Sequence, residues 1–241
     1  MPRQLAVSLV AFGALSLAGC SSSHPGRPAA ASISAPNSVA EDLAARAAAG
    51  TGRSLRATYD ARATTGRRAT VAVFLAGRDR FRVDVTEPGS TASLFGTPAG
   101  SVACTSRTGA KVSCFLVAGP GKPVPAKFDA GVQRVFSVDL PVLAVNAAAF
   151  SVRTGLELPA TGTLAAARCF IVTSAPGGPP LTRDLAGQVD LGTYCLTAAG
   201  LPRSLTFASG GLSLTGVGGA PSPAQLRPPA AAKPLPGGAA G

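Results

Sequence analysis

The residues of this chain with the clearest chemical potential are its five cysteines, because a thiol can be acylated, oxidised to a disulfide or used as a metal ligand. Cys20 stands apart, close to the N-terminus. Cys104, Cys114, Cys169 and Cys195 form an even set, as in the disulfide framework of an exported protein. Four cysteines allow three pairings, and we expect Cys104–Cys114 and Cys169–Cys195 because each pair encloses its own loop. A redox or zinc site is disfavoured, because the chain has no CxxC pair and a single histidine.

The N-terminal stretch has the plan of an export signal. Arg3 is followed by an apolar run at residues 5–17, which is too short to span a bilayer, and then by small residues. The tetrapeptide LAGC resembles the lipobox of bacterial lipoproteins. We therefore expect residues 1–19 to be a signal peptide and Cys20 to carry acyl chains that hold the protein on the outer, extracytoplasmic face of the cell membrane. An ordinary secretory signal, cleaved without lipidation, is the alternative.

The two ends of the chain differ in composition from its middle. Residues 20–37 and 216–241 are rich in Pro, Ala and Gly and nearly lack large apolar side chains. Such segments bury too little apolar surface to offset the entropy lost on ordering. We expect the lipidated cysteine with a flexible tether at 20–37, a single β-rich domain at 38–215 and a disordered tail at 216–241. The only histidine, His24, falls in the tether, where we interpret it as a solvated spacer residue.

Composition argues against several classes of function. The formal net charge is +11, but the arginines are scattered, so we expect no nucleic acid partner. Scattered positive charge favours weak attraction to anionic lipid head groups or wall polymers, although GC-rich genomes encode equally basic chains without functional meaning. Without a histidine in the domain, no Ser-His-Asp or Cys-His constellation can be built there. No HExxH or P-loop motif occurs either, so we expect no enzyme, no cofactor and no metal.

Hydrophobic periodicity predicts the strands of the domain. Residues 54–63 and 80–87 alternate apolar and polar side chains, and with the apolar run 69–76 between them they predict three antiparallel strands in a row. Further strands are expected at 91–95, 101–106, 111–117, 166–174, 187–197, 203–208 and 211–215.

A few helices complete the predicted α+β fold. Ser38 and Glu41 form a capping-box pattern, which opens a helix that ends at Gly50. Two further short helices are expected at 128–137 and 141–149, because a proline inside a helix removes a hydrogen bond. The expected architecture is a curved antiparallel sheet with these helices on its concave side.

The order of these elements resembles the LolA/LolB-like superfamily of outer-membrane lipoprotein carriers, and actinobacterial lipoproteins related to it look most similar. The resemblance covers roughly residues 38–215 and includes the strand SLRATYDAR, the hairpin ATVAVFLAGRDRFRVDV and the ending TYCLTAAGLPRSLTF. It implies a half-barrel sheet that encloses an apolar cavity for acyl chains, with the segment 128–149 as a lid. The cavity residues that it implies are Leu55, Tyr59, Val71, Val73, Phe81, Val83 and Val85.

The chain departs from the carrier pattern in its own lipid anchor, its two disulfides and its lack of tryptophan. We therefore expect a membrane-anchored protein that binds or hands on a lipid or another apolar ligand, rather than a soluble shuttle. The alternative is a non-enzymatic interaction or regulatory (sensor) lipoprotein that binds another envelope protein. A cavity of several hundred Å³ would favour the first function, and a core closed by its own side chains would favour the second.

Overall fold

The computed structural model describes residues 38–77, 80–122, 124–128, 131–175 and 189–235. The expected signal peptide at 1–19, the lipidation site Cys20 and the tether at 20–37 lie outside the described residues. Within the described ranges, no helix is long and apolar enough to cross a membrane.

The secondary structure consists mainly of strands, with one longer helix at the start and a helical stretch in the middle. The label η marks 3₁₀ turns, except η2, which is a π-helical turn. In chain order the elements are α1 (Ser38–Gly50), β1 (Ser54–Ala63), β2 (Arg68–Ala76), β3 (Phe81–Glu87), β4 (Ser90–Thr97), β5 (Gly100–Arg107), β6 (Ser113–Ala118), η1 (Ala126–Phe128), α2 (Val132–Arg134), η2 (Val135–Asp139), α3 (Leu140–Asn146), η3 (Ala147–Ala149), β7 (Phe150–Leu158), β8 (Ala167–Ser174), β9 (Gly192–Thr197), β10 (Pro202–Phe207), β11 (Gly210–Gly218), η4 (Pro223–Leu226) and β12 (Lys233–Pro234).

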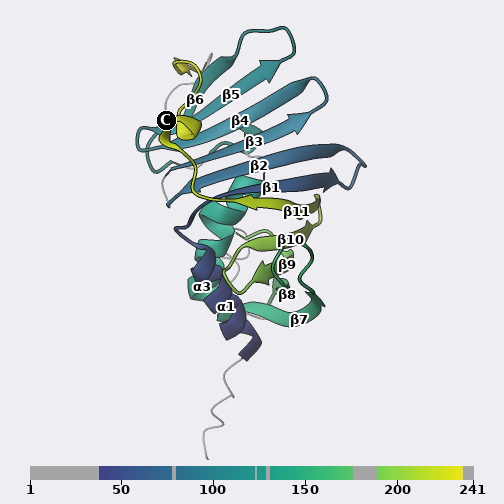
Figure 1. The fold of residues 1–241 in the computed structure, drawn as a ribbon. Helices are drawn as coiled ribbons and strands as arrows, with labels where there is room; N and C mark the ends of the chain where they lie inside the picture. The colour runs from purple at the N-terminus through teal and green to yellow at the C-terminus, as the bar shows by residue number, and fades with distance from the viewer. Residues whose placement is uncertain (1–37, 78–79, 123, 129–130, 176–188, 236–241) are drawn as a thin grey trace, which may run out of the picture. The chain divides into compact units, whose positions relative to one another are not determined.

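The described strands form one 12-stranded sheet in the order β12-β6-β5-β4-β3-β2-β1-β11-β10-β9-β8-β7 (Figure 1). Strands β1 to β6 follow one another as a meander, and β7 to β11 form a second meander. The antiparallel pairing of β1 with β11 joins the two meanders into one sheet. The short β12 pairs with β6 in parallel.

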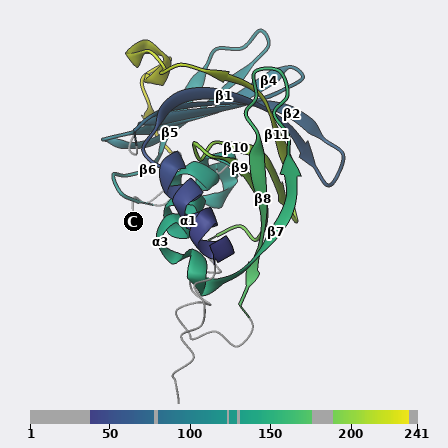
Figure 2. The same cartoon turned by 60° about the horizontal axis from the view of Figure 1, so that its bottom comes forward.

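One face of this sheet, which we call the inner face, is apolar and carries the helices. Along β1, Leu55, Ala57 and Tyr59 are buried, whereas Ser54, Arg56 and Thr58 are more exposed, as the period of two in a strand requires. The helix α1 and residues 132–149 pack on this face, and Figure 2 shows the sheet curving around them. The large curved antiparallel sheet with few helices matches the expected α+β class.

Residues 132–149 form one continuous helical run, which we call the covering segment. The expectation of two separate helices, at 128–137 and 141–149, is therefore wrong at the break. Pro141 lies in the first turn of α3, where the missing N–H is tolerated. The π-helical turn η2 comes directly before it, and the Leu140 N–H donates to the carbonyl five residues back. The π turn thus carries the chain into α3 without a break.

Two disulfides join neighbouring strands. Cys104 of β5 is bonded to Cys114 of β6, and Cys169 of β8 is bonded to Cys195 of β9. Each pair lies directly opposite in the strand register, and these are the pairs expected from the enclosed loops. Closing loops with sequence separations of 10 and 26 residues stabilises the fold by about 3 kcal/mol each on the chain-entropy estimate.

The C-terminal part of the chain is ordered as far as residue 235. The expected domain end at 215 and the expected disorder of 216–241 are therefore wrong up to that point, and residues 236–241 lie outside the described range. Strand β11 continues to Gly218, and the following residues lie on the face opposite to the helices, the outer face. There Arg82 Nη1 donates to the Gln225 carbonyl at 3.2 Å.

A second apolar cluster gives the reason for this order. Phe95, Val102, Cys104 and Cys114 are buried on the outer face, and Ala230 packs against them. Leu94, the neighbour of Phe95, points to the inner face and is buried as well. A strand with apolar side chains on both faces must be covered on both, and the C-terminal segment supplies the outer cover.

The remaining expected strands match β1 to β6 and β8 to β11, with shifts at their ends. The range expected at 187–197 begins as a strand only at Gly192, and residues 187 and 188 lie outside the described part. Strand β7 was not predicted. Its Gly155 allows a close approach, because a Cβ added there would lie 3.2 Å from the Cβ of Cys169.

We predict that Leu226→Ala lowers the free energy of unfolding by about 2–4 kcal/mol, because Leu226 is only 6% exposed and its truncation leaves a cavity. Leu156→Ala is the matched control, since Leu156 is 86% exposed, and it should change the free energy by less than about 0.5 kcal/mol. Urea unfolding followed by circular dichroism measures both. Equal, small effects would mean that the C-terminal segment does not pack on the sheet.

Candidate functional site

The seven residues expected to line a cavity lie together on the inner face of β1, β2 and β3. Val71 of β2 sits between Tyr59 of β1 and Val85 of β3 in the strand register, and Val73 lies opposite Val83. Two of the seven are partly buried against the core, and five are buried in it. The partly buried residues are Phe81 and Val85, and the buried ones are Leu55, Tyr59, Val71, Val73 and Val83.

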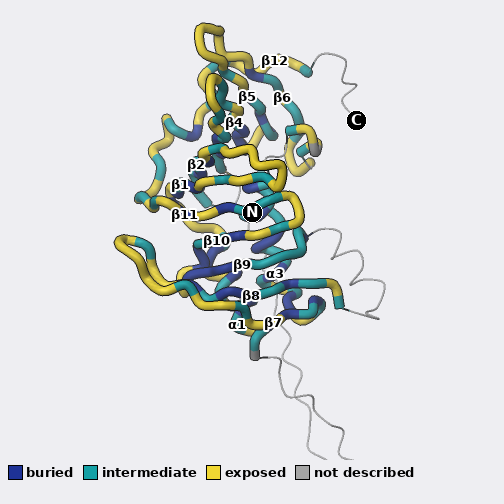
Figure 3. The backbone as a smooth tube through the Cα atoms, turned by 90° about the vertical axis from the view of Figure 1, so that its right-hand side faces the viewer, coloured by how far each residue is buried: buried dark blue, intermediate teal, exposed yellow. Residues whose placement is uncertain are grey.

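The covering segment closes the space above these residues. Val132, Val135, Leu140 and Leu143 are buried in the same core cluster as the inner face of the sheet. In Figure 3 exposed residues gather in the turns between strands, whereas buried residues recur along the strands. From β1 to β3 the inner face is thus filled by the protein's own side chains, and an acyl chain can lie between these strands and the covering segment only if that segment moves outward. Farther along the same face, Ala92 of β4 and Thr105 of β5 are exposed.

One small opening remains where the covering segment meets β2 and β3, and we call it the Gln133 pocket. Its volume is about 20 Å³, which is room for one water molecule. Apolar side chains from both sides form most of its wall. Its lining residues are Gly50, Thr51, Gly52, Leu75, Gly77, Phe81, Val83, Gln133, Phe136, Ser137 and Pro141.

The position of the Phe81 ring in this pocket depends on a glycine. Phe81 lies opposite Gly96 in the β3–β4 register. A Cβ added to Gly96 would come within 2.2 Å of Phe81 Cε1, closer than any real carbon contact. The missing side chain at Gly96 therefore lets the ring lie flat across the neighbouring strand and form the pocket wall.

Gln133 is the polar group of the pocket. Its side chain is 5% exposed, and its Oε1 is buried without a hydrogen-bond partner. The two hydroxyl groups beside it are engaged elsewhere: Ser137 Oγ donates to the Gln133 backbone carbonyl at 2.9 Å, and Thr51 Oγ1 donates to the Ala48 carbonyl at 2.8 Å. Burying an amide oxygen without a donor costs about 1–3 kcal/mol.

A second polar feature, a buried carboxylate, lies farther along the covering segment. Asp139, the last residue of η2, is fully buried. The hydroxyl of Tyr194 of β9, also fully buried, forms a hydrogen bond with Asp139 Oδ2 at 2.9 Å. Arg134 Nε lies 3.8 Å from Asp139 Oδ1 and 4.0 Å from Asp190 Oδ2. The Tyr194–Asp139 bond ties the covering segment to the sheet.

The geometry around Tyr194 favours a protonated Asp139. The Tyr194 hydroxyl lies within hydrogen-bond distance of both Asp139 Oδ2 and the Asp190 backbone carbonyl, but it has only one hydrogen. A proton on Asp139 allows both hydrogen bonds to form, because the Asp139 carboxyl then donates to the Tyr194 hydroxyl while that hydroxyl donates to the Asp190 carbonyl. Burial raises the pKa of Asp139 from 3.8 to about 7, the Tyr194 hydrogen bond and Arg134 lower it, and the Asp190 carboxylate raises it.

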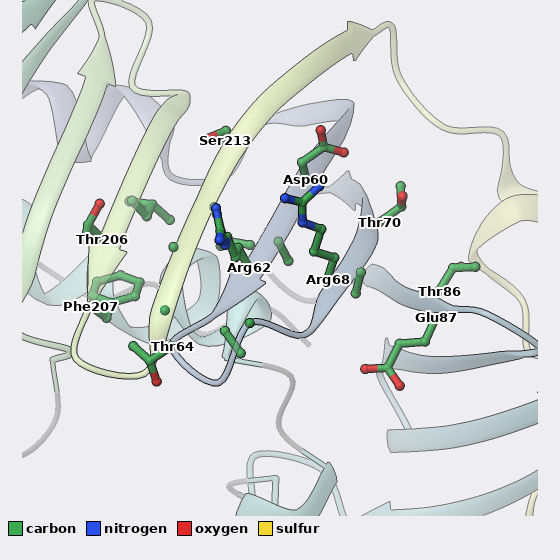
Figure 4. Close-up of a pocket in the computed structure, with 18 of the residues that line it drawn as sticks. Asp60, Arg62, Thr64, Arg68, Thr70, Thr86, Glu87, Thr206, Phe207 and Ser213 are labelled. Carbon is green, nitrogen blue, oxygen red and sulfur yellow. The ribbon is translucent and has the colours of Figure 1, made fainter.

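The outer face carries a different kind of surface. An open depression of about 1130 Å³ spans β2, β1, β11 and β10 near their turns, and Figure 4 shows its polar lining. Asp60 and Arg62 alternate with the inward Tyr59 along β1 and so belong to this face. Arg62 lies directly opposite Arg68 in the β1–β2 register, and two like charges in that arrangement disfavour each other.

Neither a family model nor a curated protein matches this chain. Within the described ranges, no group of three or more His, Cys, Asp or Glu side chains is placed to hold a metal ion.

Sequence reasoning identified Phe81, Val83 and the covering segment but missed Gln133 and Asp139. A signal for Asp139 was present. It stands four residues after Val135 and four before Leu143, both buried, and that spacing places it on the apolar stripe of a helix. The assumed helix break before Pro141 hid this spacing. For Gln133 the sequence offers only its position beside Val132 at the start of the helical run.

We predict that the stability of the protein falls as the pH rises from about 4 to about 7. The pKa of Asp139 is 3.8 when exposed and about 7 in the fold, so the folded state binds more protons than the unfolded state in this window, and the loss amounts to about 4 kcal/mol at most. Above pH 7 this contribution stays constant.

Asp139→Asn should remove most of this slope, because the amide is uncharged at every pH and can still bond Tyr194. Asp60→Asn, at an exposed position on the outer face, is the matched control and should keep it. Thermal or urea unfolding at pH 4, 5.5, 7 and 8 provides the comparison. A slope that survives in Asp139→Asn would show that other groups, and not Asp139, bind the protons that stabilise the fold.

Proposed function

We propose that this protein is a non-enzymatic lipoprotein, anchored through Cys20 on the extracytoplasmic face of the cell membrane, which binds a lipid or similar apolar ligand between the sheet and the covering segment. The volume of about 20 Å³ does not reach the several hundred Å³ that favour a ligand cavity, so the proposal requires the covering segment to open. The observation that carries it is the Gln133 pocket, where that opening would begin. Its apolar wall combines Phe81 and Val83, two of the residues expected to line a cavity, with Phe136 of the expected lid. The structure described above is then the closed, ligand-free arrangement.

The construction of the covering segment supports a movement that admits ligand. It consists of a short α turn, a π turn of five residues and an α-helix of seven residues, and helices this short have little stability of their own. It is held by apolar contacts and by the Tyr194–Asp139 hydrogen bond. Apolar contacts with the sheet can be replaced by apolar contacts with a ligand chain at little cost in free energy.

The anchor is proposed from the sequence alone. Two acyl chains on Cys20 would bury enough methylene groups for stable attachment, at about 0.8 kcal/mol each. They would also leave the folded domain free to present its Gln133 pocket to a membrane or to another envelope component.

For the anchor we predict that the full chain, expressed in a bacterium, partitions into the membrane fraction and carries a mass increase on Cys20. Cys20→Ser should move the protein to the soluble fraction, and Ser21→Ala should leave it at the membrane. Membrane partition of Cys20→Ser equal to that of the unchanged chain would contradict the anchor.

For ligand binding we predict that the Cys20→Ser chain, incubated with vesicles of bacterial lipid and reisolated, retains lipid that native mass spectrometry detects. Phe136→Ala should retain more, because it removes a ring from the opening. Phe74→Ala, which removes a partly buried ring on the outer face, should retain the same amount as the parent.

Absence of lipid from both the parent and Phe136→Ala would overturn ligand binding. It would favour the other function expected from the sequence, binding of an envelope protein, for which the outer depression beside Arg62 and Arg68 offers the larger surface.

A further inference from the structure

The unpartnered oxygen of Gln133 points to the chemistry of the ligand. Its Oε1 can only accept a hydrogen bond, it is buried, and no donor among the described residues reaches it. The pocket beside it has the size of one water molecule. A small donor group that enters the pocket would satisfy Oε1 and remove the cost of leaving it unpaired.

The other side chains that line the pocket do not donate a hydrogen bond to Gln133 Oε1. Ser137 and Thr51 donate to backbone carbonyls, as described above. The remaining lining side chains, Leu75, Phe81, Val83, Phe136 and Pro141, are apolar, and the other positions are glycines. The pocket therefore offers the carboxamide of Gln133, with the acceptor Oε1 and the donor Nε2, in otherwise apolar surroundings.

We propose that Gln133 selects amphiphiles with a neutral hydroxyl head group, such as a long-chain alcohol or a lipid with a free glycerol hydroxyl. This inference rests on the proposed ligand binding and names its class of ligand. The hydroxyl donates to Gln133 Oε1 at the pocket, and the chain extends inward along Val83 and Val73 as the covering segment moves.

Anionic head groups fit this site poorly. No Lys or Arg among the described residues lines the Gln133 pocket, so a carboxylate or phosphate would exchange its hydration for the neutral Gln133 N–H groups alone. It would also place negative charge next to the partial negative charge of Oε1. An ester head group can accept from Gln133 Nε2 but has no hydrogen to donate, and so leaves Oε1 unpaired, whereas a hydroxyl can donate to Oε1 and accept from Nε2.

Three probes with one chain length separate these cases: 1-dodecanol, methyl laurate, and laurate at pH 8. Each competes with a fluorescent lipid analogue for the Cys20→Ser chain. We expect dodecanol to bind about three- to tenfold more tightly than methyl laurate, the ratio that one hydrogen bond in an apolar site provides, and laurate to bind more weakly than dodecanol.

Variants of the pocket test whether Gln133 is responsible. Gln133→Met has a similar size and no strong acceptor, and it should bring the dodecanol-to-methyl laurate ratio close to one. Ser213→Ala removes an exposed hydroxyl on the outer face, away from the Gln133 pocket, and it should keep the ratio of the parent.

The outcomes are distinguishable. If none of the probes displaces the fluorescent lipid from the parent and Phe136→Ala binds none either, the proposed ligand binding itself fails. If the probes bind without preference for dodecanol, or if the preference persists in Gln133→Met, ligand binding stands and the role of Gln133 is overturned.

Discussion

The antiparallel pairing of β1 with β11 is the interaction on which the rest of this structure depends. Among the described strands, it is the one pairing that joins the first meander to the second. It places Tyr59 beside Leu214 and Ala61 beside Leu212, so that the apolar sides of both meanders become one inner face. The Tyr59 hydroxyl strengthens the joint by donating to the Pro202 carbonyl at 3.1 Å, at the start of β10. Without this joint the covering segment, which connects the meanders in sequence, would have no single surface to pack on.

The covering segment shields that apolar surface from water, but it also carries polar side chains into the core. Asp139 forms a hydrogen bond with Tyr194 through Oδ2, and its Oδ1, although it has no hydrogen-bond partner, lies 3.8 Å from Arg134 Nε. Gln133 lies six positions earlier on the same helical run, and its Oε1 has no hydrogen-bond partner and no charged side chain among the described pocket residues. This difference is the reason why we propose that a ligand binds at the Gln133 end of the segment, next to Phe81.

Much of the architecture follows from local rules that the sequence obeys. Alternation in 54–63 gave the inner residues of β1, and the even set of cysteines gave two cross-strand disulfides. The misses share a cause, because each residue's environment is decided by a distant part of the chain. Strand β7 contains Gly155, which reads as a loop residue but fits against Cys169. The Pro- and Ala-rich C-terminal segment has few apolar side chains to bury by itself. It packs on the sheet because it covers the apolar cluster around Phe95 on the outer face. The pattern of apolar residues predicts that Val71 and Val73 face inward. It does not predict whether other side chains fill the space above them, because that depends on their volumes.

The last described strand has a further consequence for how separate copies of this protein behave. A long sheet with an open edge can recruit the edge of another molecule and grow into an aggregate. Here the β6 edge is occupied by Lys233 and Pro234, and the proline has no N–H to offer an incoming strand. At the opposite edge, the register of β7 shifts between Thr154 and Glu157, which interrupts the regular row of backbone groups. Both features oppose the addition of a further strand, from another copy of this protein, to the edges of the sheet.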